Sequence, residues 1–443
     1  MRPRLRPRLV SLAPLLALAV AACGGDDGAA PDVDAGVYPP SADLTRDILD
    51  TGLDVDLASK TATATIQLAP SPSTGASFEV GDLTIMSVTS GGQPLMFSVA
   101  DKQLDLGVPP TTAPYDVVIT YAFKNHDSDD GFNASGFTLT WPYYCGNLFP
   151  CHSAPSDGTR FDLSVHGQAS GTVVYPSTIP GDAPSYMAAW AIGDYTRVEL
   201  GTTTAGTHVG FWVQPGEMAA AMTGTAHLKA AFDWLEQHIG PYTFGDTVGS
   251  VSVHWGRGAF GGMEHHPYWH IASDAMGDEA TNVHEASHGW FGNGVRIKCW
   301  EDFVLSEGTA RYFEGRLLEE TGATEASQAA WASVDHELAL WRSGSGGGVA
   351  WPQSCGQVDI IRDHLFSDVP YTKGAAFLRA LEQKLGRPMF DATLHAFYMR
   401  YAGKAAGEAD FLAVVKEVSG YDPMQCAQLW LINQAVPPTA PCP

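Results

Sequence analysis

"NVHEASHGWFGNG", residues 282–294, carries the spacing on which the interpretation of this chain depends. On a helix, residues four apart lie on one face, so the imidazoles of His284 and His288 can reach the same ion. Glu285 projects to the side of that ion, where a carboxylate can act on a water molecule. The glycine-rich residues 292–294 indicate the end of this helix. Because so short a pattern also arises by chance, a metal site requires a third ligand.

A candidate for this ligand follows in "CWEDFVLSEGTARYFEG", residues 299–315. Glu307 is separated from His288 by 18 residues, which accommodates the end of one helix, a loop and the start of a second helix. Ser306 is a candidate N-cap of that second helix. Two histidines and one glutamate leave a fourth coordination position open, as in catalytic zinc sites. We therefore predict one zinc ion per chain, held by His284, His288 and Glu307.

Upstream of this region, residues 43–205 show the alternation that is typical of β-strands. Apolar residues alternate with threonine and glutamine over 61–68, and a second alternating run extends to Phe123. Clusters of glycine, proline and serine separate such runs, which predicts an N-terminal β-sandwich. From residue 206 to 443 we expect a mainly α-helical domain with a small sheet. The predicted fold class is therefore α+β and multidomain.

Two elements of the second domain can be predicted individually. A helix is expected over about 217–239, because Leu228, Ala231, Phe232 and Leu235 recur on one face. A strand is expected over 248–255, and a glycine-rich loop over 343–348.

The motifs together resemble the aminopeptidase N family of zinc metallopeptidases, the gluzincins, which also includes the leukotriene epoxide hydrolase. This resemblance implies a thermolysin-like catalytic domain after the β-sandwich. Longer family members continue into further domains, so we expect a short two-domain member with a more open cleft that accepts longer peptides. Similar segments extend over about residues 140–435: "NLFPCHSAPSDGTRFDLSV" (147–165), "PSYMAAWAIGDY" (184–195), "VPYTKGAAFLRALEQKLG" (369–386) and the segment 409–437.

The exopeptidase motif of that family, Gly-Ala-Met-Glu-Asn, resembles "GGMEH" at residues 261–265. In relatives its glutamate holds the free α-amino group of the substrate, and the resemblance implies this role for Glu264. Residues 251–255, "VSVHW", are expected to supply an edge strand that pairs with the substrate backbone. The same amine-binding segment includes Gly261, Gly262 and Met263.

Histidine is unusually frequent after this motif. His265 replaces the family's asparagine, which affects the expected geometry of amine recognition, and His266 and His270 follow. We interpret these three histidines as solvent-facing loop residues, and a second metal site is the alternative. The glutamine that the first domain contributes in some relatives has no clear counterpart in "WPYYCGNLFPC", residues 141–151.

The expected chemistry is hydrolysis by a metal-activated water, with Glu285 as general base and then general acid. Tyr371, from the Tyr-x-Lys-Gly match, is expected to donate a hydrogen bond to the developing oxyanion, and a packing tyrosine is the alternative. Ligating histidines usually donate their other N–H to a carboxylate or carbonyl. We expect Asp302 to organise its loop and Glu314 to lie elsewhere on its helix, and we assign neither a catalytic role.

These residues predict a zinc-dependent aminopeptidase that removes N-terminal residues from peptides. A zinc endopeptidase is the first alternative, in case "GGMEH" does not capture the amine. A non-catalytic envelope binding protein on a peptidase scaffold is the second alternative. The complete set of ligands, base and tyrosine argues against that second alternative.

The N-terminus has the features of an export signal. Four arginines precede an apolar run that ends near Ala22, and Cys23 follows in a pattern that resembles a bacterial lipobox. We predict a signal peptide over 1–22, lipid on Cys23, and a flexible tether over 23–42. The protein is therefore expected to be an exported lipoprotein of the bacterial cell envelope, attached to a membrane only through its N-terminal lipid.

The net charge limits the kind of partner that the chain can bind, and the cysteine count predicts disulfides. The chain has 25 basic and 49 acidic residues, and loss of the four signal arginines leaves a formal net charge of −28. Such charge disfavours nucleic acid as a partner. The expected partners are peptide substrates, and a monomer is expected. Lipidation of Cys23 would leave six of the seven cysteines for three disulfides. The preferred pairs among the possible connectivities are Cys145 with Cys151, Cys299 with Cys355, and Cys426 with Cys442.

Overall fold

The computed structural model describes residues 38–255, 261–344, 347–437 and 442–443. The predicted signal peptide, Cys23 and most of the tether lie outside these residues, as do residues 345–346 of the predicted glycine-rich loop, so these features stay predictions. Residues 38–42 were predicted as tether, but this is wrong at Ser41, whose N–H donates to Leu106 O at 3.4 Å. Among the described residues, no helix has both the length and the hydropathy that a membrane span requires.

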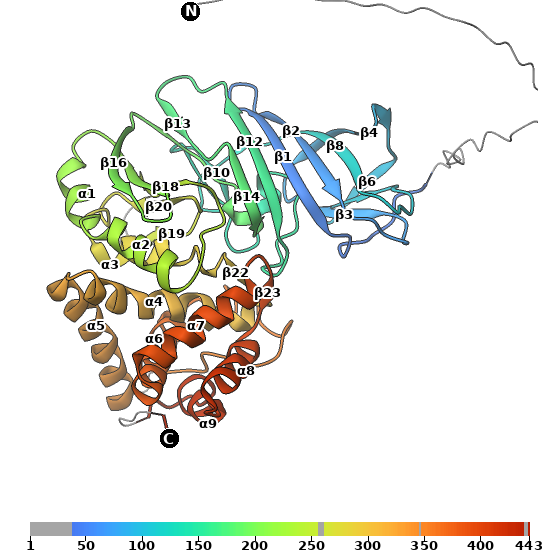
Figure 1. Cartoon of the computed structure of the whole chain (residues 1–443). Coiled ribbons are helices and arrows are strands. Elements are labelled where there is room, and N and C mark those ends of the chain that lie inside the picture. Colours follow the sequence, from blue (N-terminus) through green and yellow to red (C-terminus); the bar gives the residue numbers. More distant parts are fainter. Residues whose placement is uncertain (1–37, 256–260, 345–346, 438–441) are drawn as a thin grey trace, which may run out of the picture. The chain divides into compact units, whose positions relative to one another are not determined.

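Three sheets build the N-terminal half of the described chain (Figure 1). In β2, side chains alternate between buried and more exposed, and Ile66 and Leu68 are fully buried. Burying each such side chain contributes about 1.5–3 kcal/mol. The seven-stranded sheet has the order β14 (Thr178–Ala183), β12 (Thr159–His166), β1 (Ile48–Asp56), β2 (Thr61–Leu68), β8 (Tyr115–Ala122), β4 (Thr84–Ser90), β5 (Gln93–Pro94).

Two smaller sheets complete this half, and the predicted strand-rich N-terminal region is confirmed. One has the order β3 (Ala76–Glu79), β7 (Gln103–Leu106), β6 (Phe97–Ala100). The other has the order β13 (Thr172–Val174), β15 (Ala191–Gly193), β11 (Phe137–Leu139), β10 (Gly131–Asn133), β9 (Asn125–His126).

A separate five-stranded sheet begins the second half of the chain. Its order is β16 (Thr196–Thr202), β17 (His208–Val213), β18 (Thr247–Val253), β20 (Tyr268–Ala272), β19 (Gly262–Met263). Strand β16 precedes residue 206 but pairs with β17. Residues 38–443 form a single compact unit, so the boundary at 205–206 stays a prediction.

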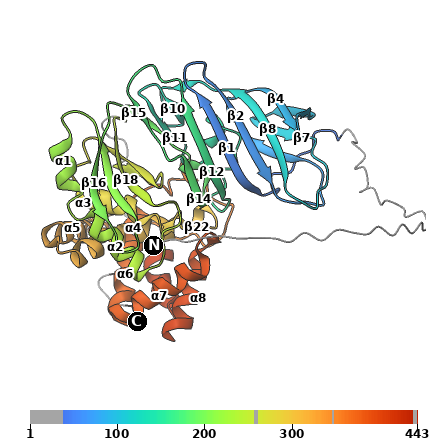
Figure 2. The same cartoon turned by 45° about the horizontal axis from the view of Figure 1, so that its top comes forward.

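Helices α1 and α2 lie between strands β17 and β18 in the chain, the other helices follow β20, and α2 and α3 contact strands of the sheet (Figures 1 and 2). The predicted helix over 217–239 is two helices, because the chain turns at 225–227; its predicted apolar face on α2 is buried as expected. The helices are α1 (Met218–Gly224), α2 (Leu228–His238), α3 (Glu279–Ser287), α4 (Phe303–Glu320), α5 (Thr324–Ser343), α6 (Asp368–Leu385), α7 (Arg387–Tyr401), α8 (Glu408–Ser419) and α9 (Met424–Ala427). A small sheet joins β21 (Phe291–Gly292), β22 (Val295–Ile297) and β23 (Ala405–Ala406).

Helices α4 and α6 cross at a pair of glycines. A Cβ on Gly308 would lie 2.7 Å from Cα of Gly374, and a Cβ on Gly374 would lie 2.5 Å from Cα of Gly308. Any larger residue would therefore push the helices apart. The close crossing fixes the relative positions of Glu307 and Tyr371, which stand on these two helices beside the glycines.

All three preferred disulfides are present: Cys145–Cys151, Cys299–Cys355 and Cys426–Cys442. The second joins residues 56 apart, and closing a loop of that length stabilises a fold by about 4 kcal/mol in the chain-entropy estimate. It also ties the segment that precedes α6 to the segment that precedes α4.

Candidate active site

Helix α3 is held against the five-stranded sheet by buried hydrogen bonds. Asp278 caps its first turn by accepting from the Thr281 N–H at 3.0 Å. Asn282 Oδ1 accepts from Ser250 Oγ at 2.6 Å, and Ser250 Oγ accepts from Trp269 Nε1 at 2.8 Å. The helix therefore keeps a fixed position on β18 and β20.

The predicted ends of the two helices at the site need correction. Helix α3 ends at Ser287 with His288 as its C-cap, before the glycines at 292–294 that were predicted to end it. Gly292 instead lies in the short strand β21, and Gly294 lies in the turn between β21 and β22. Ser306 is not an N-cap, because α4 already begins at Phe303.

Three donor atoms converge between α3 and α4. His284 Nε2 lies 3.0 Å and His288 Nε2 lies 3.4 Å from Oε2 of Glu307. Two ligands that each lie about 2.05 Å from a tetrahedral ion are about 3.3 Å apart, so these separations suit ligands of one zinc ion. All three side chains are buried, with one donor atom of each within 4.8 Å of the others. The structure thus brings together the three residues that the spacing predicted as ligands.

Chemistry of the donor set also fits a metal ion. His288 Nε2 is buried and makes no hydrogen bond within the described residues, although Glu307 Oε2 is 3.4 Å away. Leaving a buried polar atom without a partner costs about 1–3 kcal/mol. A bound cation would accept this lone pair, and imidazole nitrogen and carboxylate oxygen are both zinc ligands.

Each histidine is oriented by a bond to its other ring nitrogen. His284 Nδ1 donates to Glu314 Oε1 at 2.8 Å, which leaves Nε2 directed at Glu307. His288 Nδ1 donates to the Phe291 carbonyl at 3.0 Å, and Ser306 Oγ is 3.2 Å away. Such partners fix the tautomer and the ring orientation of ligating histidines.

The prediction that Glu314 lies elsewhere on its helix is therefore wrong. Glu314 follows Glu307 by seven residues, which is close to two full helical turns, so both carboxylates lie on one face of α4. The sequence contained this signal. Asp302 does organise its loop as predicted, since its carboxylate accepts from the Trp351 indole at 3.1 Å and from the Glu408 N–H at 2.9 Å.

Protons balance the charge of this cluster when no metal is bound. Burial acts to lower the pKa of His288, but the adjacent Glu307 raises it to about 9. Burial acts to raise the pKa of Glu307, but His288 and His284 lower it to about 2. Protons and a metal ion therefore compete for the same ring nitrogens.

Two further carboxylates, Glu264 and Glu285, lie beside the cluster. Each has an oxygen within 4.8 Å of the other and of a ring nitrogen of His288. Burial raises the pKa of Glu285 to about 8 and that of Glu264 to about 7. A nearby divalent cation favours the charged forms and acts in the opposite direction. Gly262 provides the space for this approach, because a Cβ there would lie 2.4 Å from Cγ of Glu285.

Asn293 positions the segment that carries Glu264. Its Nδ2 donates to the Glu264 carbonyl at 2.7 Å, and its Oδ1 accepts from the Tyr186 hydroxyl at 2.9 Å. We predicted Asn293 only as part of a helix end. Asparagine beside glycine is typical of turns, so its sequence position carried no sign of this connection.

Tyr371 lies over the ring of His284, with ring centroids 6.0 Å apart and planes at 17°. Its other neighbours include Phe303, at 5.8 Å between ring centroids. Burial and then the carboxylate of Glu307 raise the pKa of Tyr371 well above the usual 10, so the phenol keeps its proton. The hydroxyl is therefore available as a hydrogen-bond donor near the cluster.

The predicted edge strand is wrong. Strand β18 lies between β17 and β20, because both neighbours pair with it in parallel. Among the described residues, the edge strand is β19 itself, which contains Gly262 and Met263 and pairs there with β20 alone. The "GGMEH" segment thus presents its own backbone edge at the site.

The interpretation of the three histidines as solvent-facing is also wrong. His265, His266 and His270 are at most 1% exposed, because they belong to or adjoin the buried strand β20. His266 Nε2 donates to the Glu285 carbonyl at 2.7 Å, and its Nδ1 accepts from the Tyr242 hydroxyl at 2.8 Å. It therefore satisfies a backbone carbonyl near the C-terminal end of α3. The possible metal groups among the described residues include none of these three histidines.

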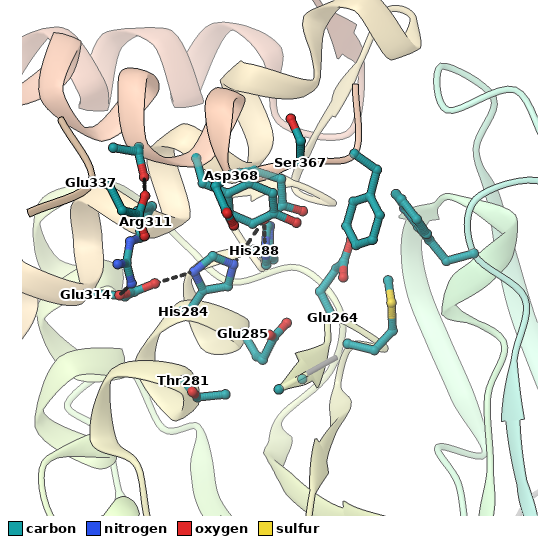
Figure 3. A pocket seen from close by; sticks show the side chains of 18 residues that line it. Glu264, Thr281, His284, Glu285, His288, Arg311, Glu314, Glu337, Ser367 and Asp368 are labelled. Atoms are coloured by element: carbon teal, nitrogen blue, oxygen red, sulfur yellow. Dashed lines mark hydrogen bonds and ion pairs between the residues drawn. The ribbon is translucent and has the colours of Figure 1, made fainter. Parts of the chain in front are cut away.

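One cavity of about 430 Å³, a size typical of small-ligand sites, is lined by the three candidate ligands and by Glu264, Glu285, Glu314 and Tyr371. Figure 3 shows His284, His288 and Glu285 between Glu264 on one side and Arg311 with Glu314 on the other. The N-terminal half contributes Trp141, whose ring lies 4.8 Å from that of Phe366. No glutamine lines the cavity within the described residues, so the glutamine of some relatives has no counterpart there.

Buried histidines four apart on one helix, a glutamate on the next, and a free carboxylate beside them define the class of single-metal peptidases. Residues 270–430 match the peptidase family M1 domain. This match and the curated relatives support the resemblance of the chain to the family of aminopeptidase N and leukotriene A-4 hydrolase.

Curated relatives support this resemblance. A leukotriene A-4 hydrolase homolog of Botryotinia fuckeliana is 26% identical over 309 residues, which cover 62% of this chain and 46% of that protein. Leucine aminopeptidase 2 of Sclerotinia sclerotiorum is 24% identical over 332 residues, covering 66% of this chain and 52% of that protein. The chain spans about half the length of these relatives.

Solved structures confirm the fold. An M1 zinc metallopeptidase from Deinococcus radiodurans superposes with a TM-score of 0.75 at 20% identity, covering 90% of this chain and 96% of that one. Legionella pneumophila aminopeptidase A, solved in complex with aspartic acid, gives a TM-score of 0.73 at 17% identity, covering 89% of this chain and 50% of that one. The predicted fold class, a strand-rich region followed by a mainly helical domain, is thereby confirmed.

Proposed function

We propose that this protein is a zinc-dependent aminopeptidase that releases N-terminal residues from peptides. The observation that carries the proposal is the position of Glu264: its buried carboxylate shares one cavity with the three candidate metal ligands and with Glu285. A peptidase with such an anchor for a positive amine selects the first peptide bond. A site for internal cleavage does not need this anchor.

The residues divide the chemistry between them. A zinc ion held by His284, His288 and Glu307 would supply a Lewis acid that polarises the substrate carbonyl and lowers the pKa of water. Glu285 accepts a proton from the attacking water and passes it to the departing amine. Tyr371 donates its O–H to the carbonyl oxygen as negative charge develops there.

The "GGMEH" segment positions the substrate. Glu264 pairs with the α-amino group, and the free backbone edge of Gly262 and Met263 in β19 pairs with the substrate main chain. Gly261 lines the cavity beside them. These contacts place the first peptide bond between Glu285 and Tyr371.

Two sets of substrates separate this proposal from a zinc endopeptidase. N-acetylated peptides lack the positive amine, so we expect them to be hydrolysed at least tenfold more slowly than the matching free peptides. A panel of fluorogenic aminoacyl substrates, assayed with and without a chelator, measures the amine-dependent activity directly. Equal rates on free and acetylated peptides would favour an endopeptidase. A protein that binds equimolar zinc but cleaves no peptide would be the non-catalytic alternative.

Removing the negative charge of Glu314, which bonds to Nδ1 of His284, should weaken metal binding. Glu314→Gln keeps the shape of the side chain but loses its negative charge, so zinc affinity is expected to fall about 10-fold to 100-fold. Competition with a chromogenic chelator measures this affinity. Glu319→Gln, an exposed change on the same helix, is the matched control and should leave zinc affinity unaltered. An unchanged affinity in Glu314→Gln would remove this residue from the support of the metal.

A further inference from the structure

Arg311 occupies a distinctive place in the cavity wall. Among the described residues that line the cavity, it is the only arginine or lysine. Figure 3 shows it on the opposite side of His284 and His288 from Glu264. The wall near it is otherwise acidic, with Glu314, Glu337 and Asp368 also lining the cavity.

The guanidinium of Arg311 is held in a defined orientation with donors to spare. Its Nη1 pairs with Glu314 on the same helix, and its Nη2 donates to Ser333 Oγ on α5 at 2.8 Å. The side chain is 19% exposed. A guanidinium carries five N–H donors, so these two bonds leave further donors for a ligand. A planar, pre-oriented guanidinium suits a carboxylate, which it can bind through two parallel hydrogen bonds.

The direction of the substrate places its C-terminal part on this side. With the α-amino group at Glu264 and the first peptide bond at the metal cluster, the residues after that bond extend away from Glu264. The carboxylate at the end of a short peptide therefore enters the part of the cavity that Arg311 lines. There Glu337 and Asp368 repel it, and Glu337 is itself fixed by a hydrogen bond from Thr372. Arg311 supplies the compensating positive charge.

We propose that Arg311 binds the C-terminal carboxylate of short peptides and thereby makes dipeptides and tripeptides the preferred substrates. This inference rests on the proposed aminopeptidase function and deepens it. It also departs from the expectation, based on sequence alone, of a cleft that favours longer peptides. Arg311 acts here as a specificity residue. Its contact with the C-terminal carboxylate adds binding energy only when the peptide is long enough, and no longer than needed, to reach from the metal cluster to Arg311.

The test compares free acids with C-terminal amides. Peptides of two to five residues share one N-terminal residue and are assayed in both forms with the zinc-loaded protein. In the wild type, kcat/KM of the free acid should exceed that of the amide at least tenfold at two or three residues. The ratio should approach one at five residues, because the carboxylate then lies beyond Arg311.

Two variants assign the preference to this side chain. Arg311→Gln should bring the acid-to-amide ratio to within about twofold of one, and Arg311→Lys should retain part of it. The amide of the same peptide is an internal control, because any disturbance of Glu314 and the metal lowers both rates together. Glu337→Gln removes a negative charge that repels the carboxylate, so it should raise the acid-to-amide ratio, whereas Arg311→Gln should lower it.

The outcomes separate this inference from the proposed function. Wild-type activity with a ratio of one at every length would overturn the role of Arg311 and leave the aminopeptidase intact. A wild-type preference that persists in Arg311→Gln would likewise overturn it. Inactivity on every peptide, with zinc bound, would overturn both. The wild-type ratio needs no variant, so the test stands even if a substituted protein fails to fold.

Discussion

Glu285→Gln should lower kcat about 100-fold to 10,000-fold while the protein keeps its zinc. The amide has nearly the same shape as the carboxylate, so it fits the tight space beside Gly262. It cannot accept a proton from water, and loss of a general base typically costs this factor. None of the three converging donor atoms belongs to Glu285, so metal content should not change. Metal analysis and initial rates on one peptide substrate, measured on the same sample, check both halves of the prediction.

Glu337→Gln is the matched control for this experiment. It removes one carboxylate from the same cavity wall but from a side chain that bonds Thr372 instead of facing Glu264 and His288. Its zinc content and its kcat on a C-terminal amide should stay close to those of the wild type. Full activity in Glu285→Gln would assign proton transfer to another group, and loss of zinc would show a structural effect instead.

Local geometry explains why the candidate metal ligands could be predicted. The 284/288 pair depends only on the pitch of one helix, and the 18-residue interval to Glu307 allowed a second helix to begin. The pairing of the six cysteines could also be predicted, since two of the three disulfides join cysteines that are 6 and 16 residues apart. Both kinds of feature are decided over short stretches of chain. The tertiary fold was needed only to bring α4 beside α3.

The features that could not be predicted depend on contacts between distant segments. His266 contacts α3 because the adjoining strand β20 is an inner strand of its sheet. The order of strands in a sheet cannot be predicted from the local pattern of apolar and polar residues. The same reason made "VSVHW" look like an edge strand. Polar residues after a glycine-rich motif are typical of loops, so exposure was the natural expectation until tertiary packing was known.

Glu314 is a different case, because its sequence position did contain the answer. Helical spacing places it two turns from Glu307, on the face that meets α3. The contacts of Arg311 show the same principle: it follows Glu307 by one turn and so also reaches the cavity. One face of α4 thus carries the candidate ligand Glu307, the carboxylate of Glu314 that supports His284, and the guanidinium of Arg311.

Tyr371→Phe is expected to lower kcat about 100-fold to 1,000-fold with little change in KM. Phenylalanine keeps the ring contacts with His284 and Phe303, so packing and the position of α6 should be preserved. What is lost is one O–H donor, and removing a single donor to a developing oxyanion typically costs this factor. Because that bond strengthens only as charge builds on the carbonyl oxygen, the loss should appear in kcat and spare substrate binding.

Steady-state kinetics on a short peptide separate the two constants for this variant. A thermal unfolding midpoint equal to that of the wild type would show that the ring still packs. Tyr401→Phe, a partly buried tyrosine on α7 that does not line the cavity, serves as the control and should leave both constants unchanged. If Tyr371→Phe instead kept its kcat and lost stability, the residue would be a packing tyrosine.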